Sequence, residues 1–338
     1  MFRFSVVRDD SDSPQSQVKR ESQGVGEDIN DANKQIQTKD VTNAEKPTTQ
    51  SDEAFLMSRG YFLLSKGILG EGTYSKVKRA YSKFRSHDVA VKIVNRKIAP
   101  KDFLKRFLPR ELQIIGQVNH PNICKYYEVL DVGHKVFIIM QHAPRGDLLE
   151  FIQCNRFLKE NVARPMFLQI AHALAYLHSY NILHRDLKCE NILLSHDLKP
   201  LLTDFGFAKH LPKFHELNKT FCGSSAYAPI EILKGIPYDG PSAEVWSLGC
   251  ILYIISTGTM PFDDSNKADQ IRQMKKGPNF TRTKQMVSNE LRSLIMSMLE
   301  TNPQKRITLN EIPNQEWSKK IAETNNTADN DQNQSENL

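Results

Sequence analysis

The sequence predicts an α+β protein with two lobes, a small five-stranded lobe with one helix and a larger, mainly helical lobe. Short β-branched and aromatic runs occupy residues 61–140, whereas helical patterns dominate after residue 146. Residues 242–258 form an apolar helical pattern that must be buried in a large core. In the loop 184–191, six of eight side chains are polar or charged, and an apolar run follows at once. Such a loop on a rigid scaffold usually carries function.

Both ends of the chain differ from its middle. Residues 1–58 are rich in Gln, Asn, Ser and Thr and hold eleven acidic against seven basic residues, and residues 318–338 hold four against two. Such segments cannot bury enough apolar surface to offset the entropy of ordering. We therefore expect disorder over 1–58 and 318–338, and a folded domain over 59–317 with lobes at 59–141 and 142–317.

Composition excludes several classes of protein. The folded part is basic, but its Lys and Arg are scattered rather than in runs, which argues against a nucleic-acid partner. No apolar run reaches 18 residues, and the start of the chain lacks a signal-peptide pattern. The five cysteines show neither metal-ligand spacing nor a disulfide framework. We expect a cytoplasmic monomer in a reducing compartment, with no membrane partner.

The small lobe is predicted from five strand-like runs and one helix. The strands are expected at 61–69, 77–81, 89–94, 129–130 and 136–140, the last two joined around Gly133. The turn 70–77 contains Gly70 and Gly72, with Ser75 at the place of a third glycine. A strand follows this turn, which distinguishes it from a dinucleotide motif. Residues 101–116 have a helical period, and Pro109 predicts that the ordered helix begins near it.

The large lobe is predicted from a series of helices. They are expected at 148–154, 161–179, 242–258, 267–275, 289–299 and 309–317, with a short strand at 201–203.

Three motifs follow one another at spacings that suggest phosphoryl transfer. Residues 184–191 fit the pattern H-R-D-L-x-x-x-N. Residues 89–92 read Val-Ala-Val-Lys, a motif expected on the third strand, and residues 204–206 read Asp-Phe-Gly. Each has an ordinary alternative. Lys92 could be a surface lysine, Glu111 a solvated helix residue, Asn191 a cap, and the tripeptide 204–206 a turn. Their joint occurrence in this order and on these elements makes the ordinary alternatives poor explanations.

Over roughly residues 60–317 the chain resembles the eukaryotic protein kinases. Within them it is similar to the testis-specific serine/threonine kinases, relatives of the calcium/calmodulin-dependent group, on the residues 70–78, 106–112, 146–152 and 260–266. Lys188, two places after Asp186, resembles serine/threonine rather than tyrosine kinases. The resemblance implies a fold of two lobes, an ATP and Mg²⁺ requirement, protein substrates and a role in spermatogenesis.

The resemblance also implies a role for each motif residue. Asp186 would accept the proton of the substrate hydroxyl, and Lys188 would steady the transferred phosphoryl group. Asn191 and Asp204 would hold magnesium. Lys92 would hold the α- and β-phosphates and pair with Glu111. The residues implied to bind ATP are Leu69, Gly70, Glu71, Gly72, Thr73, Tyr74, Ser75, Lys76, Val77, Ala90, Lys92, Glu111, Met140, Asp147 and Leu193.

The same resemblance implies roles for residues outside these motifs. Met140 would be the gatekeeper before a hinge at 141–143, and Ser224 would reach back to Asp186 and Lys188. A regulatory spine would stack His184, Phe205, Ile115 and Tyr126.

Regulation and substrate choice are also implied. Thr220 would be a phosphosite for an upstream activating kinase, its phosphate received by Arg185 with Lys209 or Lys219. Asp147 and Glu190 would select substrates with basic residues before the target serine or threonine. An equal alternative for Asp147 is that it caps the following helix.

Two departures from the family pattern leave a second interpretation open. The usual Ala-Pro-Glu is Pro229-Ile230-Glu231, although Glu231 and its expected partner Arg306 are present. An Asp usually starts the large helix and holds the catalytic loop, but here Glu244 stands in its place. Because Glu is one methylene longer, we expect it to be a poorer anchor. The alternative to an active kinase is a pseudokinase scaffold that binds nucleotide or partners without transfer.

Overall fold

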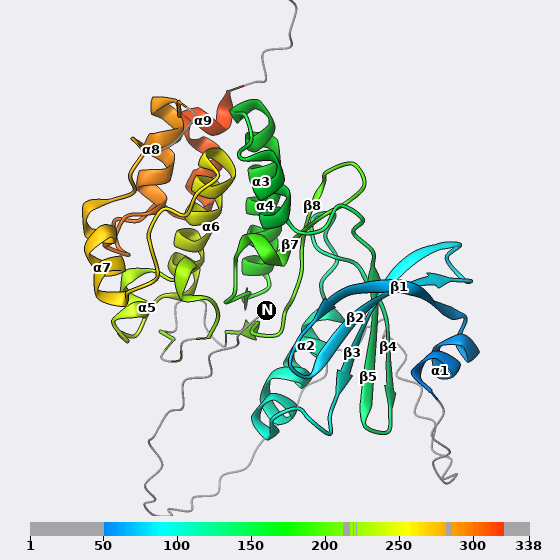
Figure 1. Cartoon of the computed structure of the whole chain (residues 1–338). Coiled ribbons are helices and arrows are strands. Elements are labelled where there is room, and N and C mark those ends of the chain that lie inside the picture. Colours follow the sequence, from blue (N-terminus) through cyan, green and yellow to red (C-terminus); the bar gives the residue numbers. More distant parts are fainter. Residues whose placement is uncertain (1–50, 212–216, 219, 221, 282–285, 321–338) are drawn as a thin grey trace, which may run out of the picture. The chain divides into compact units, whose positions relative to one another are not determined.

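The computed structural model describes residues 51–211, 217–218, 220, 222–281 and 286–320 (Figure 1). Within them the chain forms two compact units. The first comprises the described residues up to Pro100 together with Tyr126–Met140, and the second comprises Lys101–Lys125 and the chain from Gln141 on. An antiparallel sheet builds the first unit and helices dominate the second, so the predicted α+β class is confirmed.

The first unit is a five-stranded sheet, as predicted. Its strands are β1 (Tyr61–Glu71), β2 (Ser75–Ser82), β3 (His87–Asn95), β4 (Tyr126–Val132) and β5 (Lys135–Gln141), in the order β1-β2-β3-β5-β4. Strands β2 and β3 pair with Val77 directly opposite Lys92. Side chains alternate between the faces of a strand, so Ala90 and Lys92 lie on one face, and Val89, Val91 and Ile93 lie on the other in a buried cluster.

A helix precedes the sheet where we predicted disorder. Helix α1 (Asp52–Ser58) begins after Ser51, whose hydroxyl accepts a hydrogen bond from the Ala54 amide. Its Leu56 is fully buried against the sheet, and the ring of Phe55 lies 5.1 Å from that of Phe137. The prediction of disorder is therefore wrong for the end of segment 1–58, because one apolar pair is enough to dock a two-turn helix on an open sheet face. Residues 1–50 lie outside the described residues.

The segment before β4 belongs to the second unit, although we had assigned its helix to the small lobe. A π turn, η1 (Phe103–Phe107), precedes helix α2 (Leu108–Ile115). The backbone of this segment bonds to the second unit, where the Cys124 amide donates to the Leu202 carbonyl at 2.8 Å.

Helices account for most of the second unit. They are α3 (Leu148–Asn155), α4 (Glu160–Ser179), α5 (Ile230–Leu233), α6 (Gly240–Thr257), α7 (Lys267–Lys276) and α8 (Asn289–Met298), followed by a 3-10 turn η4 (Leu309–Asn314) and α9 (Glu316–Lys319). Helix α6 lies beside α4 and buries Trp246 completely, as its apolar pattern predicts (Figure 1). Pro313 falls in η4, and the helix predicted over 309–317 is broken at Gln315. Since α9 runs to Lys319, the predicted boundary of the tail at 318 is two residues early, and 321–338 lie outside the described residues.

Two small ladders hold the loops that carry the motifs. Strand β6 (Ile182–Leu183) pairs with β9 (Lys209–His210), and β7 (Ile192–Leu194) pairs with β8 (Pro200–Leu202). The loop 184–191 therefore runs between two paired strands and ends in the 3-10 turn η2 (Cys189–Asn191). Within the described ranges no helix has the length and apolar character needed to cross a membrane.

Candidate active site

Backbone conformation is unusual at one residue of the loop 184–191 and one of the tripeptide 204–206, and specific contacts hold both segments. Arg185 has φ of 64° and Asp204 has φ of 63°, values that non-glycine residues adopt only where the surroundings enforce them. The fully buried His184 ring lies 5.2 Å from that of Phe205, and its Nε2 is 2.9 Å from the Thr203 carbonyl. This contact agrees with the lower half of the predicted spine.

Asp186 is the centre of a buried polar network. Its carboxylate is only 2% exposed, and Lys188 Nζ lies 2.8 Å from Oδ2. The Asn191 side-chain amide donates to Oδ2 at 3.0 Å and to the Asp186 carbonyl at 2.8 Å. A buried carboxylate is costly unless it is paired and hydrogen-bonded, and this one is both. These contacts fix the direction of the carboxylate. A side chain that accepts a proton from a substrate needs such a fixed direction.

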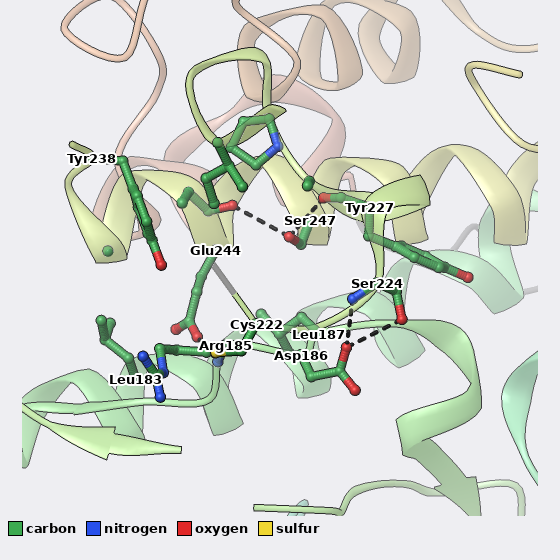
Figure 2. A pocket seen from close by; sticks show the side chains of 15 residues that line it. Leu183, Arg185, Asp186, Leu187, Cys222, Ser224, Tyr227, Tyr238, Glu244 and Ser247 are labelled. Carbon is green, nitrogen blue, oxygen red and sulfur yellow. Dashed lines mark hydrogen bonds between the residues drawn. The ribbon is translucent and has the colours of Figure 1, made fainter. Parts of the chain in front are cut away.

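Ser224 reaches back to this network from the other side. Its amide and hydroxyl both donate to Asp186 Oδ1, at 3.0 and 3.2 Å, as Figure 2 shows. Lys188 Nζ in turn lies 3.1 Å from the Ser224 hydroxyl. The contact of Ser224 with Asp186 and Lys188 that we predicted is thus present in the structure.

The tripeptide 204–206 provides a second carboxylate in the same unit. The Gly206 amide donates to Asp204 Oδ1 at 3.3 Å. A Cβ on Gly206 would lie 3.2 Å from that oxygen, a tight contact, and 3.9 Å from Glu111 Oε2, an ordinary one, so glycine gives room to the Asp204 carboxylate. Glu111 is itself buried, at 2% exposure.

The oxygen ligands available here suit magnesium. Because the Asn191 amide nitrogen is used on Asp186, its carbonyl oxygen is the atom left for a ligand role. Magnesium is commonly held by one or two protein carboxylates together with phosphates and water, so Asp204, together with the Asn191 carbonyl oxygen, could hold it. Among the described residues no cluster of three or more His, Cys, Asp and Glu side chains suggests a different metal centre.

Glu244 anchors the catalytic loop, which corrects our expectation that it reaches poorly. Its Oε1 accepts a hydrogen bond from the Arg185 amide at 2.6 Å, and its Oε2 lies 2.6 Å from Nε2 of the buried His178. Figure 2 shows Glu244 beside Arg185. His178, on α4, takes up the second oxygen of the longer side chain. His178 was not among the predicted site residues, and no local sequence pattern indicates that it meets Glu244, 66 residues away.

The Arg185 side chain turns toward the segment that follows Asp204. Its Nε donates to the Phe207 carbonyl at 2.7 Å. Burial raises the pKa of the Cys222 thiol, and the positive charges of Arg185 and Lys209 oppose that rise. The charges of Arg185 and Lys209 therefore lower the pKa of Cys222, which is two residues after the exposed Thr220. Lys219 lies outside the described residues.

A hollow in the second unit adjoins Asp186 and Ser224. Figure 2 shows it between the loop at Leu183–Leu187, the segment at Cys222 and the start of α6. Tyr238 lines it and donates to the Thr220 carbonyl at 3.1 Å, which ties the segment around Thr220 to the loop before α6.

The displaced proline does not disturb its surroundings. Pro229 is the N-cap of α5, and Glu231 in the first turn forms the predicted buried pair with Arg306. The two nitrogen–oxygen distances are 2.9 and 3.3 Å, and the arginine side chain is fully buried. This bidentate contact involves the glutamate and not the proline, so the shifted position of Pro229 does not prevent the ion pair.

Two candidate substrate-binding carboxylates already have partners. Asp147 caps α3, where Oδ1 accepts a bond from the Glu150 amide at 2.9 Å, so the alternative we gave for it is correct. Glu190 accepts from the Tyr227 hydroxyl at 3.1 Å, a partner that the sequence did not suggest. Each of these contacts uses one oxygen of its carboxylate. Leu193 forms an isolated bridge with Asp147.

The remaining candidates lie in the first unit. The residues from Leu69 to Val77, which include Glu71, Thr73, Tyr74 and Ser75, connect or end β1 and β2, and a surface ion pair joins Lys76 to Glu71 at 2.7 Å. A Cβ on Gly70 would meet no protein atom within 4 Å, so protein packing does not require glycine there. Approach of a ligand to the backbone does give a reason. Met140 is buried at the end of β5 and pairs with Tyr126.

Comparisons with known proteins agree with this geometry. The protein kinase domain model matches residues 63–318. Testis-specific serine/threonine-protein kinase 1 of Mus musculus is 46% identical over 273 residues, which cover 79% of this chain and 74% of that protein. Testis-specific serine/threonine-protein kinase 3 of Mus musculus is 44% identical over 78% of this chain and 98% of that protein. NUAK family SNF1-like kinase 1 of Mus musculus is 42% identical over 74% of this chain but 37% of that protein.

Proposed function

The chain belongs to the protein kinase family and is a protein serine/threonine kinase, and from this premise we propose how it works and what it acts on. It transfers the γ-phosphate of ATP, bound with Mg²⁺, to serine or threonine hydroxyls of proteins that are basic before the target. The convergence of Lys188, Asn191 and Ser224 on the Asp186 carboxylate is the observation that carries this proposal.

Asp186 accepts the proton of the substrate hydroxyl as that oxygen attacks. The attacking oxygen must lie within hydrogen-bond reach of the carboxylate, and the contacts to Asn191 and Ser224 keep the carboxylate from turning away. Lys188, already 2.8 Å from Asp186, places a positive charge where the phosphoryl oxygens gain charge during transfer. When bound, the magnesium ion neutralises phosphate charge, and Asn191 and Asp204 are the residues that would hold it.

Nucleotide binding is assigned to the first unit together with a few residues of the second. Lys92 holds phosphates, and Gly70 and Gly72 let backbone amides approach them. Val77 lies opposite Lys92 in the ladder and shares its face with Ala90, which suits an apolar slot beside a phosphate-binding cation. Leu193 and Met140 would line the same slot, Glu111 would pair with Lys92, and Asp147 would contact the ribose.

The biological role is proposed from the similar proteins, and the substrate preference from the negative charges of Asp147 and Glu190. We propose a role in spermatogenesis because two of the similar proteins are named testis-specific kinases. Asp147 and Glu190 would face basic residues before the target, and an upstream kinase would phosphorylate Thr220. We also propose that the protein acts as a cytoplasmic monomer.

A pseudokinase scaffold is the competing proposal. Its support came from Glu244 and the displaced Pro229, but Glu244 reaches the Arg185 amide and Glu231 still pairs with Arg306. A scaffold would not need the acceptor, the cation and both proposed metal ligands. These observations favour the active enzyme.

Radiolabel transfer from ATP to a generic basic protein separates the two proposals. The wild type should label the protein in magnesium and not in EDTA, and Lys92→Met should remove most of the activity while the melting temperature is unchanged. Lys83→Met, in the exposed turn after β2, is the matched control and should leave transfer intact. Transfer by Lys92→Met within twofold of wild type, or no transfer by wild type, would reject the proposal.

A further inference from the structure

Strand β1 is an edge of the sheet in the first unit. Of the described strands only β2 pairs with it, along a register that runs from Tyr61 opposite Ser82 to Glu71 opposite Lys76. With eleven residues β1 is longer than most strands. A long edge is a template on which another extended segment can pair, and proteins usually shorten it, charge it or cover it.

An exposed row of apolar side chains accompanies this edge. Phe62 of β1 lies directly opposite Tyr81 of β2, so both side chains are on one face of the sheet, and they are 38% and 40% exposed. Leu64, two residues further along β1, is also exposed. The exposed Phe84 ring lies 2.6 Å from the position of a Cβ on Gly60, which places it beside the start of β1. We call Phe62, Leu64, Tyr81 and Phe84 the apolar row.

The opposite face of the sheet is already covered. Leu56 of α1 packs there in the buried cluster that contains Tyr61, Val89 and Val91. Because successive side chains of a strand alternate between faces, α1 lies on the face away from Phe62 and does not cover the apolar row. An edge strand with exposed apolar side chains suits strand addition, in which the edge provides main-chain hydrogen bonds and the side chains provide specificity.

One segment outside the described residues has the pattern of a matching strand. Residues 2–6 read Phe-Arg-Phe-Ser-Val and alternate strictly between apolar and polar side chains. Phe2 and Phe4 are the only aromatic residues among residues 1–50. A strand with this alternation presents both phenylalanines on one face, as pairing beside the apolar row requires.

The linker between this segment and the first unit is long enough for the contact. Helix α1 begins at Asp52, is about 10 Å long and leads directly into β1 at Tyr61. A flexible chain of about 45 residues spans about 35–40 Å on average. The segment is therefore within reach of the β1 edge of its own molecule.

We propose that residues 2–6 bind along the outer edge of β1 as a sixth strand, with Phe2 and Phe4 beside the apolar row. The contact is within one molecule and covers an edge that could otherwise pair with another chain, in keeping with the monomer proposed above. A tether gives an effective concentration of about 1 mM, so a free-peptide Kd of about 100 µM corresponds to about 90% occupancy of the edge. The contact does not depend on phosphoryl transfer, so it stands or falls separately from the proposed function.

Hydrogen exchange of the full-length protein tests where the segment binds. Phe2→Ser combined with Phe4→Ser should speed exchange of the β1 amides that point away from β2 by about tenfold, because an edge that is about 90% covered becomes fully open. Ile29→Ser combined with Ile36→Ser removes two apolar side chains elsewhere in residues 1–50 and is the matched control, for which β1 exchange should stay unchanged. Unchanged exchange in β1 for the phenylalanine pair, or the same increase in the control, would overturn the proposal.

Binding of a labelled peptide of residues 1–8 provides a second readout. By fluorescence anisotropy, the full-length Phe2→Ser, Phe4→Ser variant should bind the peptide with a Kd of about 100 µM, and the wild type about tenfold more weakly because its own segment competes. Adding Phe62→Ser to the variant should weaken binding about three- to tenfold, whereas adding Met57→Ser, at an exposed apolar residue of α1, should not. A peptide of the same composition with adjacent phenylalanines should not bind, because its rings would lie on opposite faces. Equal binding of both peptides, or equal binding to both proteins, would refute the proposal.

Sedimentation separates a contact within one molecule from a contact between two. The wild type and the Phe2→Ser, Phe4→Ser variant should both be monomers at the low micromolar concentrations of the exchange experiment. A wild-type dimer that dissociates in this variant would place residues 2–6 on the β1 edge of a second copy and would overturn the intramolecular contact.

Discussion

Replacing Glu244 by aspartate tests whether the catalytic loop depends on the length of this side chain. The change withdraws the carboxylate by one carbon–carbon bond, about 1.5 Å. Both contacts of Glu244 are 2.6 Å long, to the Arg185 amide and to His178, so the shorter side chain cannot keep the two together. The sequence alone suggested that aspartate would anchor the loop at least as well, and the geometry reverses that expectation.

The magnitude follows from burial. The Glu244 side chain is 5% exposed and that of His178 is 7% exposed, so a lost contact is not replaced by water. A hydrogen bond to a charged group contributes about 1.5–3 kcal/mol, so loss of one contact and weakening of the other should cost about 2–4 kcal/mol of unfolding free energy. For a unit of this size that lowers the melting temperature by about 4–16 °C. Because Arg185 precedes Asp186, kcat should fall about ten- to a hundredfold as the base is displaced.

Thermal melting and steady-state kinetics of Glu244→Asp are the assay. Glu244→Gln keeps the length and one acceptor, so it should lose less stability than the aspartate variant. Glu53→Asp, at an exposed position of α1, is the control for the same chemical change. If Glu244→Asp has the melting temperature of the control and the wild-type kcat, the length of the Glu244 side chain is not what anchors the loop.

Three other predictions concern substrate, regulation and the cysteines. A peptide array should show preference for basic residues before the target, weakened by Glu190→Gln, and an acidic or proline-directed preference would contradict this. Thr220→Ala should strongly lower activity and Arg185→Ala should make the enzyme insensitive to phosphorylation, whereas intact-mass analysis that finds Thr220 unmodified in fully active enzyme would exclude the switch. Burial raises the pKa of Cys124 to about 12 and also raises those of Cys189 and Cys250, so these thiols stay protonated at neutral pH, and iodoacetamide should label the exposed Cys154 long before them.

The sequence predicted those parts of the site that local motifs determine. The loop 184–191 and the tripeptide 204–206 fall where expected, because each lies between short paired strands, and the predicted Glu231–Arg306 pair is present. Ser224 also reaches Asp186 as expected.

Contacts between distant segments could not be predicted from the same patterns. His178 and Glu244 are 66 residues apart, and nothing local in either helix indicates that they meet. Helix α1 is only seven residues long, too short for a helical period, and its stability comes from the sheet beneath Leu56. At Pro109 the sequence predicted a late helix start, which α2 confirms, but it did not predict the π turn η1 that precedes this helix.

The central claim is that the Asp186 carboxylate accepts the proton during phosphoryl transfer, and Asp186→Asn tests it most directly. The variant keeps the size of the side chain but removes the acceptor charge that Lys188 and Asn191 surround. Transfer from radiolabelled ATP should have a kcat lower by about 10²–10⁴, with ATP affinity by calorimetry and the melting temperature close to wild type. A variant that transfers phosphate at the wild-type rate would contradict the account.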